Sequence, residues 1–120
     1  MQWLLLLNPD DSLFDFPSVE RALRSCPGFT DFRLDDPFGS LIECQYEEPD
    51  SWTTIRLRGN RSVISLTSTW GAALKAVLLI QKSLGRPLRL INDDYTFDLT
   101  FSDIDTVEEL EAAMERAGTS

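Results

Sequence analysis

The fold is decided by residues 42–67, which read IECQYEEPDSWTTIRLRGNRSVISLT. Apolar and polar residues alternate in three runs along this stretch, a pattern typical of strands that bury one face and expose the other. Gly59-Asn60, between the second and third runs, indicates a two-residue hairpin turn. We therefore expect three antiparallel strands with one apolar face, formed by Ile42, Cys44, Tyr46, Ile55, Leu57, Ile64 and Leu66.

The flanking segments add further elements. Before the three strands, the pattern predicts a buried central strand over 3–7, a short helix over 19–24 and a strand over 29–34. After them, residues 70–84 are rich in Ala and Leu and end at Gly85, which favours a helix. Strands are expected over 88–91 and 95–101, and Thr106 to Glu109 fits the capping box of a last helix.

The expected order is β-α-β-β-β-β-α-β-β-α. This order predicts an α+β fold, a two-layer sandwich with a mostly antiparallel sheet and helices on one face. The 120 residues suffice for one self-supporting core, so we expect a single domain over 1–120.

Charge is sorted along the chain. The formal charge is −8 over residues 1–51, +7 over 52–92 and −8 over 93–120, giving −9 in total. Such sorting suits either a positively charged partner or internal pairing between segments. Internal pairing has a specific form here, because neighbouring strands would bring Glu43 and Glu47 close to Arg56 and Arg58.

Composition argues against several functions. The chain has no histidine, and Cys26 and Cys44 lack the spacing of a metal or redox motif. No glycine-rich phosphate loop or EF-hand register is present, so we expect no enzyme activity, no cofactor and no metal. A pI near 4.3 disfavours nucleic acids and anionic membranes as partners. Reduced thiols are typical of cytoplasmic proteins.

Surface recognition remains as the expected function. Amphipathic aromatic residues in acidic surroundings are common at interfaces, and clustered acids can steer a cationic partner. Glu108, Glu109 and Glu111 are assigned instead to the favourable first turns of the last helix. The candidate partner-binding residues are Trp52, Asp93, Asp94, Tyr95, Asp98, Asp103 and Asp105.

The C-terminal half resembles a known class of proteins. Residues 71–88, GAALKAVLLIQKSLGRPL, are followed by 92–99, NDDYTFDL, and an acidic last helix. With these features, the C-terminal half is similar to small acidic immunity proteins of bacterial polymorphic toxin systems, including those delivered by contact-dependent and type VI systems. The resemblance implies a cytoplasmic antidote that binds one cognate toxin, with a basic surface or cleft, and occludes its active site.

An alternative from another class is a small non-enzymatic adaptor or regulatory domain. It would hold a partner on its polar sheet face or on the wide apolar helix over 70–84, and a homodimer through Leu79 and Ile80 is one form of it. We expect a monomer in preference to this dimer.

Overall fold

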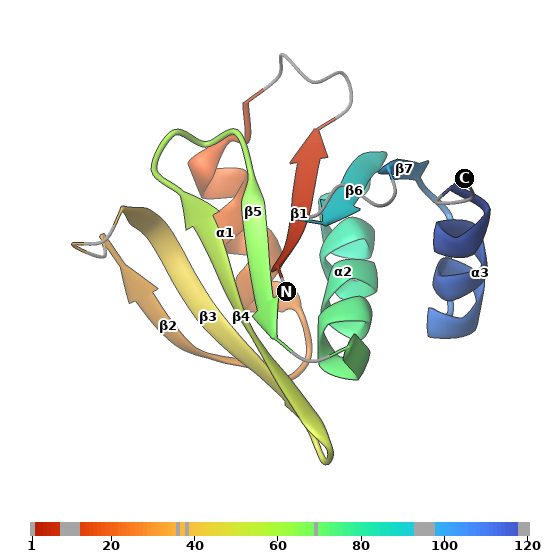
Figure 1. Cartoon of the computed structure of the whole chain (residues 1–120). Coiled ribbons are helices and arrows are strands. Elements are labelled where there is room, and N and C mark those ends of the chain that lie inside the picture. Colours follow the sequence, from red (N-terminus) through yellow and green to blue (C-terminus); the bar gives the residue numbers. More distant parts are fainter. Residues whose placement is uncertain are drawn as a thin grey trace.

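The computed structural model describes residues 2–7, 13–35, 37, 39–68, 70–92 and 98–117. Their elements follow the predicted order. The strands are β1 (Gln2–Leu7), β2 (Phe29–Leu34), β3 (Ser40–Glu48), β4 (Ser51–Arg58), β5 (Ile64–Ser68), β6 (Leu88–Asn92) and β7 (Asp98–Phe101). The helices are α1 (Phe16–Ser25), α2 (Trp70–Leu84) and α3 (Val107–Ala117), and the α+β class is confirmed (Figure 1).

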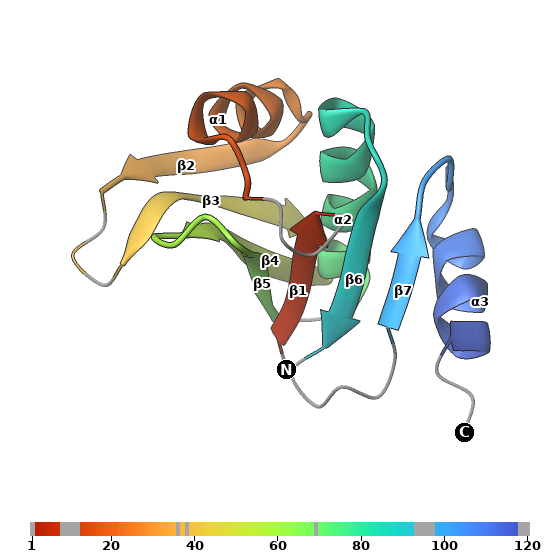
Figure 2. The ribbon, with the colours of Figure 1, turned by 90° about the horizontal axis from the view of Figure 1, so that it is seen from above.

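The strands form one seven-stranded sheet in the order β2-β3-β4-β5-β1-β6-β7. Every neighbouring pair is antiparallel. The first strand of the chain lies between β5 and β6, which confirms the central position expected from its continuous apolar run. It joins the β2–β5 meander to the β6–β7 hairpin, and the sheet turns sharply at this point (Figure 2).

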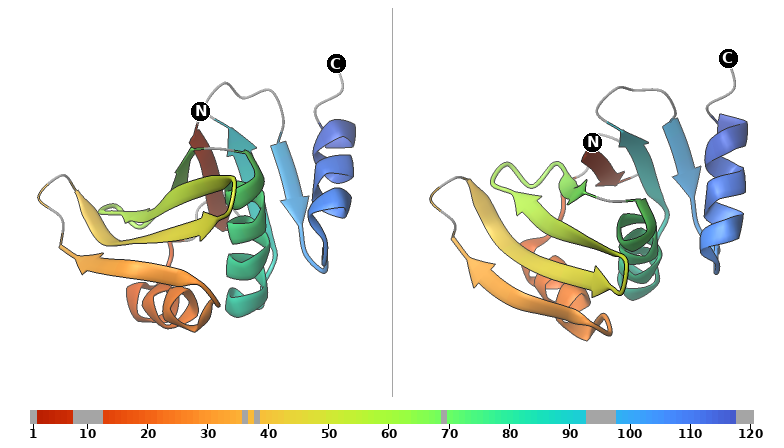
Figure 3. Two further views of the ribbon diagram at one scale, coloured as in Figure 1. Left: turned by 90° about the horizontal axis from the view of Figure 1, so that it is seen from below. Right: turned by 60° about the horizontal axis from the view of Figure 1, so that its bottom comes forward.

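Helix α2 lies in the concave side of this bent sheet, between the meander and β6–β7 (Figure 3). It contacts β3, β4 and β5 on one side and the helices α1 and α3 on others. These neighbours explain why its apolar surface is wider than one stripe. Ile80 is fully buried within the chain and Leu79 is packed against the core, so Ile80 is not available for the dimer considered above.

The first and last helices are fixed by their caps. Asp15 caps α1, because its carboxylate accepts a hydrogen bond from the backbone N–H of Ser18 at 3.2 Å. Thr106 caps α3, accepting from the backbone N–H of Glu109 at 3.1 Å and donating to the side chain of the same residue. One half of the predicted capping box is therefore present, while the Glu109 carboxylate accepts from the Thr106 hydroxyl in place of the Thr106 backbone N–H. Helix α1 begins three residues earlier than expected.

The two edges of the sheet are closed differently. At the β7 edge, α3 lies alongside the strand and buries Leu110 and Met114 in the core (Figure 2). At the β2 edge, the register shifts between Thr30 and Arg33, where Asp31 has a φ of 57°. A bulge carrying charged side chains discourages another strand from pairing there.

Candidate partner-binding surfaces

Part of the charge sorting is internal pairing. On the polar face of the sheet, the Arg56 Nε donates to the Glu43 Oε1 at 2.7 Å. Arg89 on β6 pairs with Asp98 on β7 at 2.6 Å. The expected approach of Glu47 to Arg58 is wrong, because the hairpin register places Glu47 opposite Trp52 near the turn, whereas Arg58 lies at the far end of β4, opposite Ser40.

A third ion pair ties α2 to the segment before α3, where Lys82 Nζ lies 3.3 Å from the Asp105 carboxylate. Each of these three pairs joins a base of the middle segment to an acid of a flanking segment. Both partners of this last pair are more than half exposed, so it adds little stability.

The structure separates the predicted partner-binding residues. Asp93, Asp94 and Tyr95 lie outside the described residues. Asp98 is on the edge strand β7, and its hydrogen bond from Arg89 holds its pKa below the usual value of 3.8. Asp103 and Asp105 lie together between β7 and α3, whereas Trp52 lies on β4 and shares no pocket with them.

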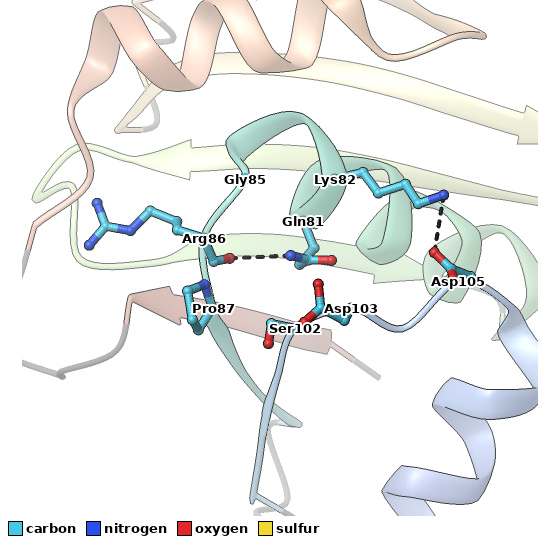
Figure 4. Close-up of a pocket in the computed structure, with 8 residues that line it drawn as sticks. All are labelled: Gln81, Lys82, Gly85, Arg86, Pro87, Ser102, Asp103 and Asp105. Carbon is cyan, nitrogen blue, oxygen red and sulfur yellow. Dashed lines mark hydrogen bonds and ion pairs between the residues drawn. The ribbon is translucent and has the colours of Figure 1, made fainter.

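Asp103 and Asp105 line a pocket of about 440 Å³ at the C-terminal end of α2 (Figure 4). The pocket is open to solvent between the end of α2, the start of β6 and the segment that follows β7. Its walls carry both charges and uncharged polar groups, and the lining residues are Gln81, Lys82, Gly85, Arg86, Pro87, Ser102, Asp103 and Asp105.

Sequence reasoning missed Gln81 and Ser102. Gln81 is only 6 % exposed, and its Nε2 donates to the Arg86 backbone carbonyl oxygen at 3.4 Å. A signal for Gln81 was present, because it follows Val77 and Leu78 at helical spacing and so occupies an inward position of α2. A polar residue at such a position is a candidate for a site.

The β3–β4 hairpin forms a second surface, which we call the acidic hairpin (residues 47–52). Glu47, Glu48 and Asp50 are exposed there, and no ion pair within the described residues holds them. Trp52, which is 50 % exposed, lies beside them and lines a hollow of about 440 Å³ with the rest of the hairpin. The β3–β4 hairpin lies at one end of the sheet (Figure 1), and it places an exposed aromatic side chain beside three acids.

The two thiols are inside the protein. Burial raises the pKa of the Cys44 thiol to about 12, and burial also raises the pKa of Cys26, whose Sγ lies 3.3 Å from the Ser83 Oγ. Neutral buried thiols are poor nucleophiles. Within the described ranges, no three or more His, Cys, Asp or Glu side chains are grouped so as to bind a metal ion.

A scan against protein-family models, a search of curated proteins and a search of solved structures each found no match. In the part of the chain that the structure describes, no helix combines the length and apolar composition needed to cross a membrane.

Proposed function

We propose that this protein is a stoichiometric inhibitor that binds one basic partner protein, a bacterial toxin, and covers the toxin's active site. It acts in the cytoplasm, carries out no catalysis and needs no cofactor. The resemblance of residues 71–99 and of the acidic last helix to immunity proteins supports this function, as does the formal charge of −9. The partner is a protein with a basic surface or cleft.

The acidic hairpin is the observation that carries the proposal. Exposed tryptophan side chains are enriched among residues that dominate binding energy, because they bury a large area at low entropic cost. Three exposed acids next to Trp52 disfavour an anionic partner and raise the encounter rate with a cationic one. The hairpin therefore combines an aromatic anchor with the charge that selects a basic protein.

Co-expression tests this proposal. The chain is expressed with the protein encoded beside it, and both co-purification and survival of cells that produce that neighbour are measured. We expect a complex of one copy of each protein and rescue of growth. A neighbour that neither binds nor loses its toxicity would contradict the proposed function.

A further inference from the structure

We propose that the pocket at the C-terminal end of α2 binds an arginine side chain of the partner protein. This inference rests on the proposed function and assigns it a specific recognition site. The acceptors that carry it come from three places in the chain: the buried Gln81 on α2, Asp103 after β7, and the last turn of α2 itself (Figure 4).

The Gln81 side chain offers an acceptor oxygen without a donor. Its Nε2 points to the Arg86 backbone carbonyl, and because a carbonyl oxygen only accepts, this contact fixes which end of the carboxamide is nitrogen. The Oε1 therefore faces the other way, where no described residue donates a hydrogen bond to it. A donor that enters the pocket replaces water at this oxygen and gains a direct contact.

Asp103 adds negative charge at the same place. In Figure 4 its carboxylate is turned toward the Gln81 carboxamide, so the carboxylate and the Gln81 side chain face one another across the pocket. The last carbonyls of α2 contribute the partial negative charge of a helix C-terminus. All of these groups favour a cationic donor.

The chain's own cations do not fill this position. Lys82 reaches outward to Asp105, with a distance of 3.3 Å from its Nζ to the carboxylate oxygen. The Arg86 side chain extends away from Gln81 (Figure 4). The space between Gln81 and Asp103 is thus lined by acceptors, and Lys82 and Arg86 remain at its rim.

A guanidinium group matches these acceptors better than an ammonium group. Its planar fork can give two parallel hydrogen bonds to the Asp103 carboxylate while a further N–H points to the Gln81 Oε1. A pocket of about 440 Å³ has room for this side chain. We therefore assign the pocket to an arginine of the partner.

Binding of a blocked Gly-Arg-Gly peptide to the full chain, followed by NMR, tests the assignment. The comparison peptide carries citrulline, which has the same shape without the charge. We expect saturable shifts at the Gln81 side-chain amide and at Ser102 and Asp103, with binding of the citrulline peptide at least roughly tenfold weaker. Equal binding of the two peptides, or shifts centred elsewhere, would overturn the assignment.

Variants sharpen the test. Asp103→Asn and Gln81→Met should each weaken binding of the arginine peptide, Asp103→Asn by roughly tenfold or more. Lys82→Met should strengthen binding, because it frees Asp105 and removes a competing cation; a purely structural role for these residues gives no such gain. Glu108→Gln, the same charge change on α3 outside the pocket, is the matched control and should leave the affinity unchanged.

Failure of the pocket and failure of the proposed function are distinguishable. If the chain binds a toxin and Asp103→Asn forms that complex with wild-type affinity, the arginine assignment is wrong and the inhibitory function stands. If no toxin is bound although the peptide results hold, the pocket stands and the proposed function fails.

Discussion

The Glu43–Arg56 pair shows how a single residue is fixed by its neighbours. Glu43 is 8 % exposed although it lies on the polar face of the sheet, and Arg56 on the adjacent strand provides its counter-charge. The hydroxyl of Ser65, opposite Arg56 on β5, is buried and has no hydrogen-bond partner. Beside this ion pair, on the same two strands, the Thr54 hydroxyl donates to the Gln45 Oε1 at 3.3 Å.

Removing Arg56 should be costly because it leaves a poorly solvated carboxylate without a partner. We expect Arg56→Met to lower the free energy of unfolding by about 1–3 kcal/mol in urea denaturation. Glu20→Gln is the control, since it breaks only the exposed pair with Arg24 on α1, and should change the free energy by less than about 0.5 kcal/mol. Equal effects of the two substitutions on the free energy of unfolding would show that burial of Glu43 does not make its ion pair more important for stability.

The buried thiols give a second expectation at this scale. Cys44 keeps its proton in the folded state up to a pKa of about 12, whereas in the unfolded chain it ionises near 9.0. The stabilisation that comes from keeping the Cys44 thiol protonated in the folded state is therefore complete below pH 9. It is lost as the pH rises toward 12. At pH 8 a thiol-alkylating reagent should label neither cysteine in the folded protein and both in urea. Rapid labelling of the native protein would contradict this.

Among the elements, those with regular alternation were predictable from the sequence and those set by register were not. The three alternating runs and the Thr106 cap have local causes, so they could be read directly. The two-residue turn expected at Gly59-Asn60 is wrong, because the connection between β4 and β5 runs over residues 59–63. The bulge between Ser40 and Ile42 has no local signal, and it places Arg58 opposite Ser40. The pocket of Gln81 and Asp103 was missed because it depends on how α2 and the end of β7 pack.

The β6–β7 hairpin depends on an ion pair whose effect varies with pH. The hydrogen bond from Arg89 lowers the pKa of Asp98 below 3.8 in the folded state, so the pair stabilises the protein above pH 3.8 and is lost as the pH falls through the lowered pKa. Asp98→Asn should therefore flatten the loss of stability as the pH falls below 3.8, as measured by chemical denaturation at each pH. Glu108→Gln is the control; a wild-type profile for Asp98→Asn would exclude this role for Asp98.

The acidic hairpin should contribute to binding more than to stability. With Trp52 half exposed, we expect Trp52→Ala to lower the affinity for the toxin by about 2 kcal/mol while the melting temperature changes little. Leu34→Ala is a matched control, because Leu34 is 49 % exposed on the edge strand β2. Calorimetric titration measures the affinity of each variant for the toxin. If Leu34→Ala weakened binding as much as Trp52→Ala did, the hairpin would not be the anchor.

Across the whole molecule, opposite charges gather at opposite ends of β4. The strand starts at the acidic hairpin and runs to a hairpin that carries Arg58 and Arg61 (Figure 1). Internal pairs such as Arg56–Glu43 account for some of the charge between these ends. The hairpin acids form no ion pair among the described residues, so the charge sorting serves internal pairing and, in our proposal, recognition of a partner.

Stopped-flow association with the toxin over a salt series tests the central claim most directly. Salt screens long-range attraction, with a Debye length of about 8 Å at physiological ionic strength and about 3 Å at 1 M. We predict that added salt slows association much more than it speeds dissociation. The triple variant Glu47→Gln, Glu48→Gln and Asp50→Asn should lower the association rate and flatten its salt dependence. The control is a triple variant with the same charge change elsewhere, Glu20→Gln, Asp31→Asn and Asp35→Asn. It should retain most of the association rate and most of its salt dependence. If the hairpin variant kept the wild-type association rate and salt dependence, the acidic hairpin would not steer a basic partner.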